Sequence, residues 1–187
     1  MPDNDDYNCG TRTRTGGDLD DISTALPFLE ALYLENSGIS GDLSALSSCI
    51  NLAELVLDEC VHGDLSSLSP LLALKSFHIT PTLYDDGDDV FISGDLSSLS
   101  LLQDLVYLRI SGCPRVNGNL SSLASLVALK DLEIKIGRLE GNISLLSPLI
   151  ALRDLHLWPC SLDINGSPES FEPLNLMDVG GGYCTTR

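Results

Sequence analysis

Residues 118–136 read GNLSSLASLVALKDLEIKI, a glycine-containing turn followed by regularly spaced leucines. The first half of this stretch recurs along the chain, starting at Gly17, Gly41, Gly63, Gly94 and Gly141, with GDLDDIS at Gly17 the most divergent copy. Successive starts are separated by 24, 22, 31, 24 and 23 residues. A period of this size is the sequence signature of a repeat architecture, in which each unit stacks on the next.

The second half recurs six times, as LEALYLENS, LAELVLDEC, LKSFHITPT, LVYLRISGC, LKDLEIKIG and LRDLHLWPC, starting at Leu29, Leu52, Leu74, Leu105, Leu129 and Leu152. These nonapeptides resemble the leucine-rich-repeat signature L-x-x-L-x-L-x-x-N/C-x-L, and the resemblance covers residues 17–165. It implies an α/β solenoid with a curved parallel β-sheet on its concave face and short helical or irregular turns on its convex face.

Each unit also carries an apolar-x-Gly-x-apolar element, as in VHGDL at Val61 and VNGNL at Val116. This element is similar to the L-x-G-x-I step of the plant-specific repeat class, which implies a second short strand in each coil. The Pro that usually follows in that class is Ser here. We expect the glycine to supply a positive φ or a close backbone approach, and the following Asp or Asn to bond local amides rather than to help cradle a phosphate.

Alternation of period two within the nonapeptides predicts which side chains are buried. Pairs such as Leu32 and Leu34, or Phe77 and Ile79, should point inward and stack on neighbouring coils. A coil of about 23 residues cannot bury its leucine face alone, so the stability of the array should be collective.

The 187 residues include 27 acidic and 10 basic side chains, giving a formal charge of −17. This length fits one domain, which we divide into a polar N-terminal tail or cap (1–16), the solenoid (17–165) and a C-terminal cap with a Gly-rich tail (166–187). The charge disfavours nucleic acid and anionic lipid, and favours neutral or basic partners. The longest apolar runs are too short to span a membrane, and the opening MPDNDDYNCG lacks a signal-peptide pattern.

The patterns of catalytic and metal sites do not match the sequence. His62, His78 and His156 lie outside any H-E-x-x-H motif, and His78 and His156 should be about 14 Å apart on strands three coils apart. The insertion TLYDDGDDVF at 82–91 is acidic but does not match a calcium loop, so we interpret it as a solvated loop that is also a candidate for partner contact. We expect no enzyme activity, no cofactor and no metal.

The cysteines and the glycosylation sequons favour different compartments. Cys60, Cys113 and Cys160 occupy the Asn/Cys position of alternate coils, about 10 Å apart, which predicts free, buried thiols and a cytoplasmic location. Sequons at Asn119, Asn142 and Asn165 favour the alternative, a secreted or cell-surface protein.

The outward strand positions form the predicted recognition surface, and none of the eighteen is leucine. They are Ala31, Tyr33, Glu35, Glu54, Val56, Asp58, Ser76, His78, Thr80, Tyr107, Arg109, Ser111, Asp131, Glu133, Lys135, Asp154, His156 and Trp158. We expect the partner to contact Tyr33, His78, Tyr107, Arg109, His156 and Trp158, because aromatic and Arg side chains dominate interface energetics. The alternative role of Trp158 is to cover the last coil.

These observations predict a monomeric, non-catalytic module that binds a protein or peptide on its concave face. One alternative is an extracellular, glycosylated module that uses the same face for adhesion, defence or inhibition of a secreted enzyme. Another is a structural protein whose solenoids stack side by side into an assembly.

Overall fold

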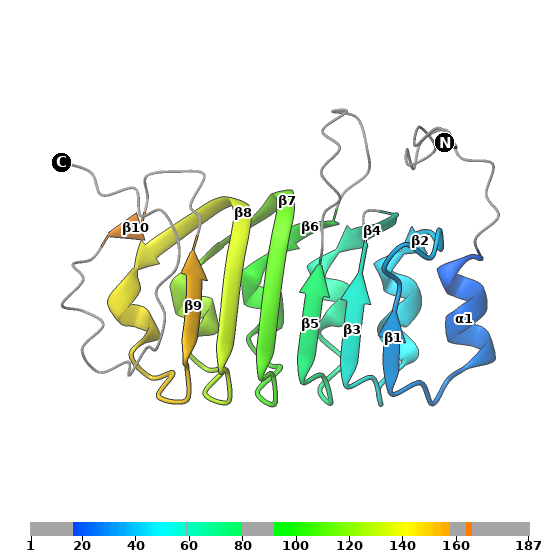
Figure 1. The fold of residues 1–187 in the computed structure, drawn as a ribbon, viewed down its shortest axis with the longest axis horizontal. Helices are drawn as coiled ribbons and strands as arrows, with labels where there is room; N and C mark the ends of the chain where they lie inside the picture. Colours follow the sequence, from blue (N-terminus) through cyan, green and yellow to red (C-terminus); the bar gives the residue numbers. More distant parts are fainter. Residues whose placement is uncertain (1–16, 59, 80–91, 158–163, 166–187) are drawn as a thin grey trace, which may run out of the picture.

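A computed structural model describes residues 17–58, 60–79, 92–157 and 164–165 as one solenoid of stacked coils (Figure 1). The helix α1 (Leu19–Ala25) lies at its N-terminal end, with Asp18 capping the helix by accepting a hydrogen bond from the Asp20 amide. One strand of each coil contributes to a parallel row that forms the concave face. These strands are β1 (Ala31–Tyr33), β3 (Glu54–Leu57), β5 (Ser76–Ile79), β7 (Tyr107–Asn119), β8 (Asp131–Asn142) and β9 (Asp154–Leu157).

A second strand row follows the first, as the apolar-x-Gly-x-apolar elements predicted. It consists of β2 (Gly41–Asp42), β4 (Val61–Asp64), β6 (Ile92–Asp95), β10 (Ile164–Asn165) and the C-terminal parts of β7 and β8. Each coil then turns through a short 3₁₀ helix: η1 (Leu43–Ser48), η2 (Leu65–Leu68), η3 (Leu96–Leu99), η4 (Leu120–Leu123) or η5 (Ile143–Leu146). β7 and β8 each run unbroken through both rows.

The turn glycines have the two roles expected of them. Gly63 adopts φ 121°, a conformation that residues with a side chain rarely adopt. A Cβ added to Gly118 would lie only 2.6 Å from the Leu96 Cβ of the preceding coil. The glycines therefore allow both the backbone turn and close stacking of the coils.

A ladder of carboxylate and amide side chains caps the five 3₁₀ helices. In each coil the Oδ1 atom of an Asp or Asn accepts a hydrogen bond, 2.8 or 2.9 Å long, from the amide of the Ser two residues later. We call this set the Asx ladder; it comprises Asp42, Asp64, Asp95, Asn119 and Asn142. The hydrogen bonds to Ser44 and Ser66 lower the pKa of Asp42 and Asp64. The ladder confirms the predicted turn chemistry.

Leucine side chains from both strand rows and from the 3₁₀ turns form one continuous core. Inward residues such as Leu55, Phe77 and Leu132 are fully buried, which confirms the predicted alternation. Burying one such side chain is worth about 1.5 to 3 kcal/mol. Because each leucine packs on neighbouring coils, this stabilisation is shared along the array.

The cysteines depart from expectation at one position. Cys113 is a free, buried thiol as predicted, and burial raises its pKa to about 12, while Cys49 is also free and buried. Cys60, in contrast, is half-buried and disulfide-bonded, so the prediction of a free thiol there is wrong. The error has a physical cause: strand spacing forbids bonds among cysteines at the Asn/Cys position of alternate coils, but it does not restrict a bond to a cysteine elsewhere in the chain.

Several predicted features lie outside the described residues, namely the terminal segments 1–16 and 166–187, the insertion 82–91, Cys160 and Trp158. Within the described ranges, none of the helices is long and apolar enough to cross a lipid bilayer.

Candidate binding face

The strand register aligns the outward side chains of the concave face into two rows. The first row contains Ala31, Glu54, Ser76, Tyr107, Asp131 and Asp154. The second row contains Tyr33, Val56, His78, Arg109, Glu133 and His156. Beyond these rows, Ser111 and Lys135 are paired at the next outward position. We use the term concave face for these residues together with Glu35.

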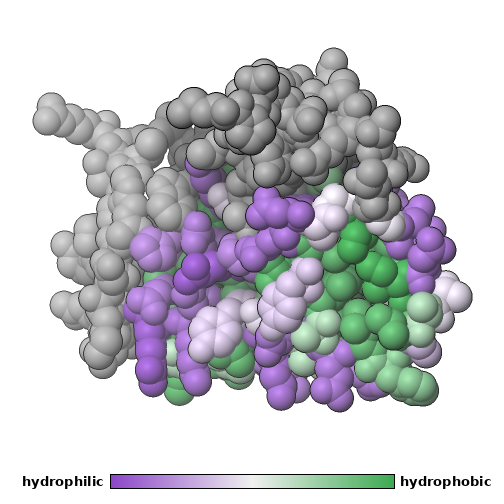
Figure 2. Space-filling view, turned by 45° about the vertical axis from the view of Figure 1, so that its right-hand side comes forward, coloured by the Kyte–Doolittle hydropathy of each residue, from purple (hydrophilic) through white to green (hydrophobic). Residues whose placement is uncertain are grey.

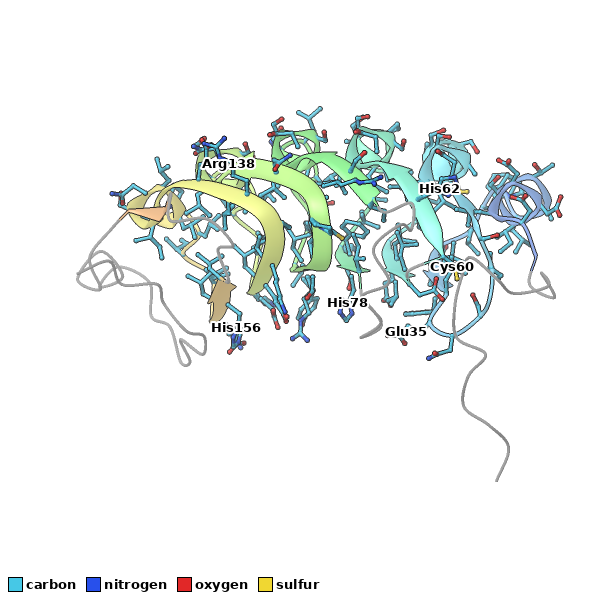
Figure 3. All side chains as sticks on the ribbon, turned by 90° about the horizontal axis from the view of Figure 1, so that it is seen from above. Glu35, Cys60, His62, His78, Arg138 and His156 are labelled. Carbon is cyan, nitrogen blue, oxygen red and sulfur yellow. The ribbon has the colours of Figure 1, made fainter. Side chains whose placement is uncertain are left out.

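Five of the six predicted contact residues can be placed on this face. Tyr33 and Tyr107 are 58% and 48% exposed, and the Arg109 side chain is 44% exposed. His78 and His156 are half-buried. Figure 3 shows Glu35, His78 and His156 on one side of the molecule, and His62 and Arg138 toward the opposite side. The strands therefore bring these five residues onto a common surface.

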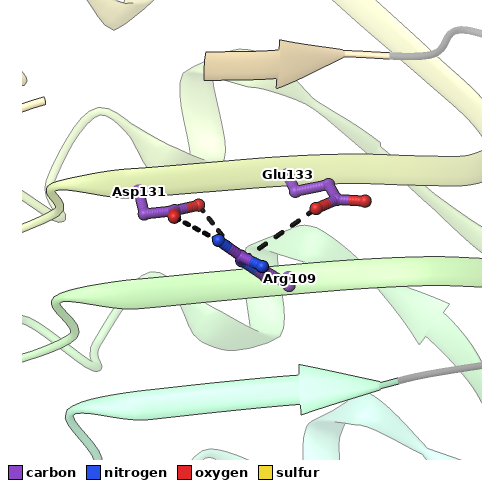
Figure 4. Close-up of polar contacts among 3 residues, drawn as sticks. All are labelled: Arg109, Asp131 and Glu133. Carbon is purple, nitrogen blue, oxygen red and sulfur yellow. Dashed lines mark hydrogen bonds and ion pairs between the residues drawn. The ribbon is translucent and has the colours of Figure 1, made fainter. Parts of the chain in front are cut away.

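Arg109 already forms ion pairs within the face (Figure 4). Its Nη2 atom lies 2.5 Å from Oδ2 of Asp131, and its Nε atom lies 3.3 Å from Oδ1 of the same carboxylate. The Nε atom is also 4.0 Å from Oε2 of Glu133. The hydrogen bond to Asp131 raises the pKa of Arg109, and the Asp131 side chain is only 11% exposed. Arg109 is thus held in place before any partner arrives.

A second cross-strand contact lies near the N-terminal end of the face. The Tyr33 hydroxyl donates a hydrogen bond to Oε2 of Glu54 on β3, which lies diagonally across from it because the register pairs Tyr33 with Val56. This hydrogen bond raises the pKa of Tyr33. The tyrosine ring remains exposed while its hydroxyl is oriented, an arrangement that leaves the ring available for stacking or apolar contact.

His78 lies midway along the second row, beside Arg109 on the next strand. Partial burial lowers its pKa, and the positive charge of Arg109 lowers it further, against the opposing effect of nearby carboxylates. The imidazole is therefore mainly neutral at pH 7, because its ordinary pKa is already about 6.5. His156 lies three strand positions away in the same row, which agrees with the separation expected from the repeats.

Acidic side chains give the face its overall charge, although none of them is among the six predicted contact residues. Its carboxylates outnumber its cations, Arg109 and Lys135; they are Glu35, Glu54, Asp131, Glu133 and Asp154. All five carboxylates occupy outward positions of the aligned nonapeptides, but aromatic and Arg residues were predicted as contacts by residue type, which leaves out the charge of the face as a group. Figure 2 shows hydrophilic side chains over much of this side and hydrophobic side chains gathered at the N-terminal end. In the part of the chain that is described, no three His, Cys, Asp or Glu side chains cluster as metal ligands.

Comparisons with known proteins identify the fold. No family model matches the sequence, and no curated protein matches it. Internalin C2 from Listeria monocytogenes is similar in structure, with a TM-score of 0.57 and 21% identity over 90% of this chain and 78% of that chain. The Arabidopsis receptor kinase HAESA, solved with the peptide hormone IDA and the co-receptor SERK1, gives a TM-score of 0.61 and 23% identity.

The HAESA match covers 84% of this chain but only 26% of HAESA. The PEPR1–AtPEP1 structure is also similar, with a TM-score of 0.54 and 17% identity over 86% of this chain and 26% of that chain. At these identities the likeness concerns the fold. The chain therefore has the leucine-rich-repeat fold, as the nonapeptides predicted.

Proposed function

We propose that this chain is a non-catalytic recognition module that binds a neutral or basic protein segment on its concave face. The observation that carries the proposal is the composition of that face, where exposed tyrosines lie among carboxylates on strands fixed by a leucine core. Proteins that share the fold support the class of partner, since HAESA was solved with a peptide hormone. Glu54, Glu133 and Asp154 would pair with basic residues of the partner.

The geometry favours binding without large rearrangement. Five strand-to-strand steps make a strip about 24 Å long. A strip of this length can host a contact patch that approaches the area of about 800 Å² per partner found in standard interfaces. The contacts of Arg109 with Asp131 and of Tyr33 with Glu54 already order two of the predicted contact residues. Less conformational entropy is then lost on binding. Tyr107 is paired with Asp131, and His156 is paired with Glu133, so both lie next to the ion pairs of Arg109. They complete the proposed central contact.

A displayed library of random dodecapeptides tests this proposal. We expect the retained peptides to be enriched in Lys and Arg, and to bind about tenfold more weakly to a Glu133→Gln/Asp154→Asn double variant, because two attractive charges are lost. Glu140→Gln is the matched control, since Glu140 pairs with Arg138 in the second strand row. Equal loss in the control, or enrichment of acidic peptides, would exclude the proposed face.

An extracellular, glycosylated form of the same module is a second candidate, supported by the Cys60 disulfide. Stable disulfides are typical of oxidising compartments. Asn142 is exposed, and its ladder hydrogen bond uses Oδ1, which leaves the amide nitrogen available for a glycan. The cytoplasmic alternative depended on free thiols at the Asn/Cys positions of the repeats.

Secretion from a eukaryotic cell line distinguishes the two locations. We expect N-glycosidase to shift the mobility of the secreted chain, and Ser144→Ala to remove the part of the shift due to Asn142. That substitution destroys the sequon but keeps the Ser144 amide that donates to Asn142. An unshifted chain with a reactive Cys60 thiol would favour the cytoplasmic form.

A further inference from the structure

The turns that lead into the concave strands lie side by side along one long edge of the solenoid, the lower edge in Figure 1. We call this surface the turn edge; it comprises residues 26–30, 49–53, 69–75, 100–106, 124–130 and 147–153. Backbone hydrogen bonds of 2.7 or 2.8 Å join each turn to the next, from Ala53 N to Glu30 O through to Arg153 N to Lys130 O. The edge is therefore as regularly spaced as the sheet itself.

Exposed apolar side chains are concentrated on the turn edge. Of the ten large hydrophobic residues that are exposed within the described ranges, seven lie here: Leu26, Phe28, Ile50, Leu72, Leu101, Val127 and Ile150. Their exposed fractions run from 51% at Leu26 to 82% at Ile150. Every one of the six turns contributes at least one. Contiguous exposed apolar surface on a soluble domain commonly marks an interaction site.

The charges on the turn edge differ from those of the whole chain. The edge carries two acidic residues, Glu30 and Asp104, and three basic ones, Lys75, Lys130 and Arg153. The described ion pairs involve other residues, so these five charges are not used within the fold as described. Counting turns from the N-terminus, the order is acidic, neutral, basic, acidic, basic, basic.

This order is complementary to itself when one edge is reversed against another. The first turn then faces the sixth, bringing Glu30 toward Arg153 of a second copy, and the third faces the fourth, bringing Lys75 toward Asp104. The second turn has no charge to oppose Lys130 of the fifth. The apolar residues also match, since Phe28 faces Ile150, Ile50 faces Val127 and Leu72 faces Leu101.

We propose that the turn edge is a self-association surface, on which two copies of this chain pack edge to edge in antiparallel orientation about a two-fold axis. Such an isologous contact uses the same patch on both copies and closes at a dimer. An in-register parallel arrangement would instead bring each charge against its own kind. The dimer replaces the monomer expected from the sequence, and it leaves both concave faces outside the contact.

The size of the edge sets the strength of this association. The strip is about 24 Å long and one turn wide, which puts it near the lower end of specific interfaces. We therefore expect a weak dimer with a dissociation constant of tens of micromolar or more. Added salt should weaken it only in part, because screening acts on the ion pairs and not on the apolar contacts.

Sedimentation velocity of the full chain from about 1 µM to about 1 mM measures the dimer directly. We expect the weight-average mass to rise toward two chains, and Leu72→Asp/Leu101→Asp to keep the protein monomeric throughout. Both side chains are more than half exposed, so the variant should fold, and circular dichroism checks this. Arg115→Glu is the charge control, because Arg115 is an exposed residue of β7 away from the turn edge.

Charge exchange tests the antiparallel geometry. Lys75→Glu and Asp104→Lys should each weaken self-association by about tenfold, because each puts like charges together at two symmetric places. Mixing the two variants should restore a dimer of wild-type strength, since both junctions then pair opposite charges. Combining the two substitutions in one chain should also restore it.

Three outcomes would overturn the proposal. The first is a wild-type chain that stays monomeric at the highest concentration. The second is a dimer that the turn-edge substitutions leave unchanged. The third is a monomer that binds phosphatidylserine vesicles through these same residues, because the edge would then be a lipid-binding surface.

Discussion

The Asx ladder and the second row of the concave face are built by the same repeats, yet their sequences behave in opposite ways. All five ladder positions hold Asp or Asn with Ser two residues later. The six positions of the second row hold five residue types, among them Tyr33, Arg109 and Glu133. Positions that every coil needs for folding are therefore repeated, while positions free of that need differ from coil to coil.

If repeated positions carry the stability, the largest loss should come from the core. We expect Leu132→Ala to lower the free energy of unfolding by about 2 to 5 kcal/mol, because it leaves a cavity between Leu108 and Leu155 of the adjacent strands. Urea denaturation measures the change. Leu145→Ala is the control, since Leu145 is 36% exposed and should lose less. A loss under about 1 kcal/mol at Leu132 would contradict the comparison.

On the varied face, stability should depend on one residue that is part of an ion pair. Arg109→Ala should lower the free energy of unfolding by about 1 to 2 kcal/mol, because it leaves the largely buried Asp131 carboxylate without its partner. Tyr107→Ala should change it by less than about 0.5 kcal/mol. Thermal denaturation distinguishes the two, and adding Asp131→Asn to Arg109→Ala should recover most of the loss. Equal effects of Arg109→Ala and Tyr107→Ala would show that the pair contributes little.

The ladder should show a smaller effect that depends on pH. Asp64→Ala should lower stability by about 1 kcal/mol near pH 7, since the Ser66 amide loses its acceptor. The pKa of Asp64 is lower in the folded chain than in the unfolded chain. The ionised carboxylate therefore stabilises the fold fully above the unfolded pKa of about 4, and this stabilisation is lost as the pH falls through the folded pKa.

Asp64→Asn is the matched variant, because Asn119 and Asn142 make the same cap without a titrating group. We expect the stability difference between wild type and Asp64→Asn to change only below about pH 4. Denaturation curves collected from pH 3 to pH 7 measure it. A difference that stays constant over this range would mean that the Ser66 hydrogen bond does not depend on the charge of Asp64.

The sequence predicted most of the architecture because the fold depends on local, repeated patterns. Period-two alternation placed Leu55 and Phe77 in the core, and the Gly-Asx elements predicted both the second strands and the caps. Each of these features is decided within a few residues, and each is repeated in several coils. The agreement between copies made the inference strong.

Features that depend on contacts between coils were harder to predict. The pairing of Arg109 with Asp131 is diagonal, whereas the register places Glu133 opposite Arg109. The Cys60 disulfide was not predicted because strand spacing limits only bonds among cysteines at the same repeat position. The turn edge was missed because exposed residues such as Ile50 and Leu72 look like core residues in a leucine-rich sequence. Residue type alone does not reveal exposure.

The unbroken strands β7 and β8 have a consequence for local opening of the molecule. Their pairing begins with Tyr107 opposite Asp131 and ends with Asn119 opposite Glu140. These two coils are therefore joined in both strand rows. In a quasi-one-dimensional array, fluctuations start at the ends and stop where neighbours are bound most extensively. Amide hydrogen exchange should therefore be slowest at Leu108 and Leu132, and should become faster toward β1. The middle of the solenoid would then remain folded while its N-terminal end frays.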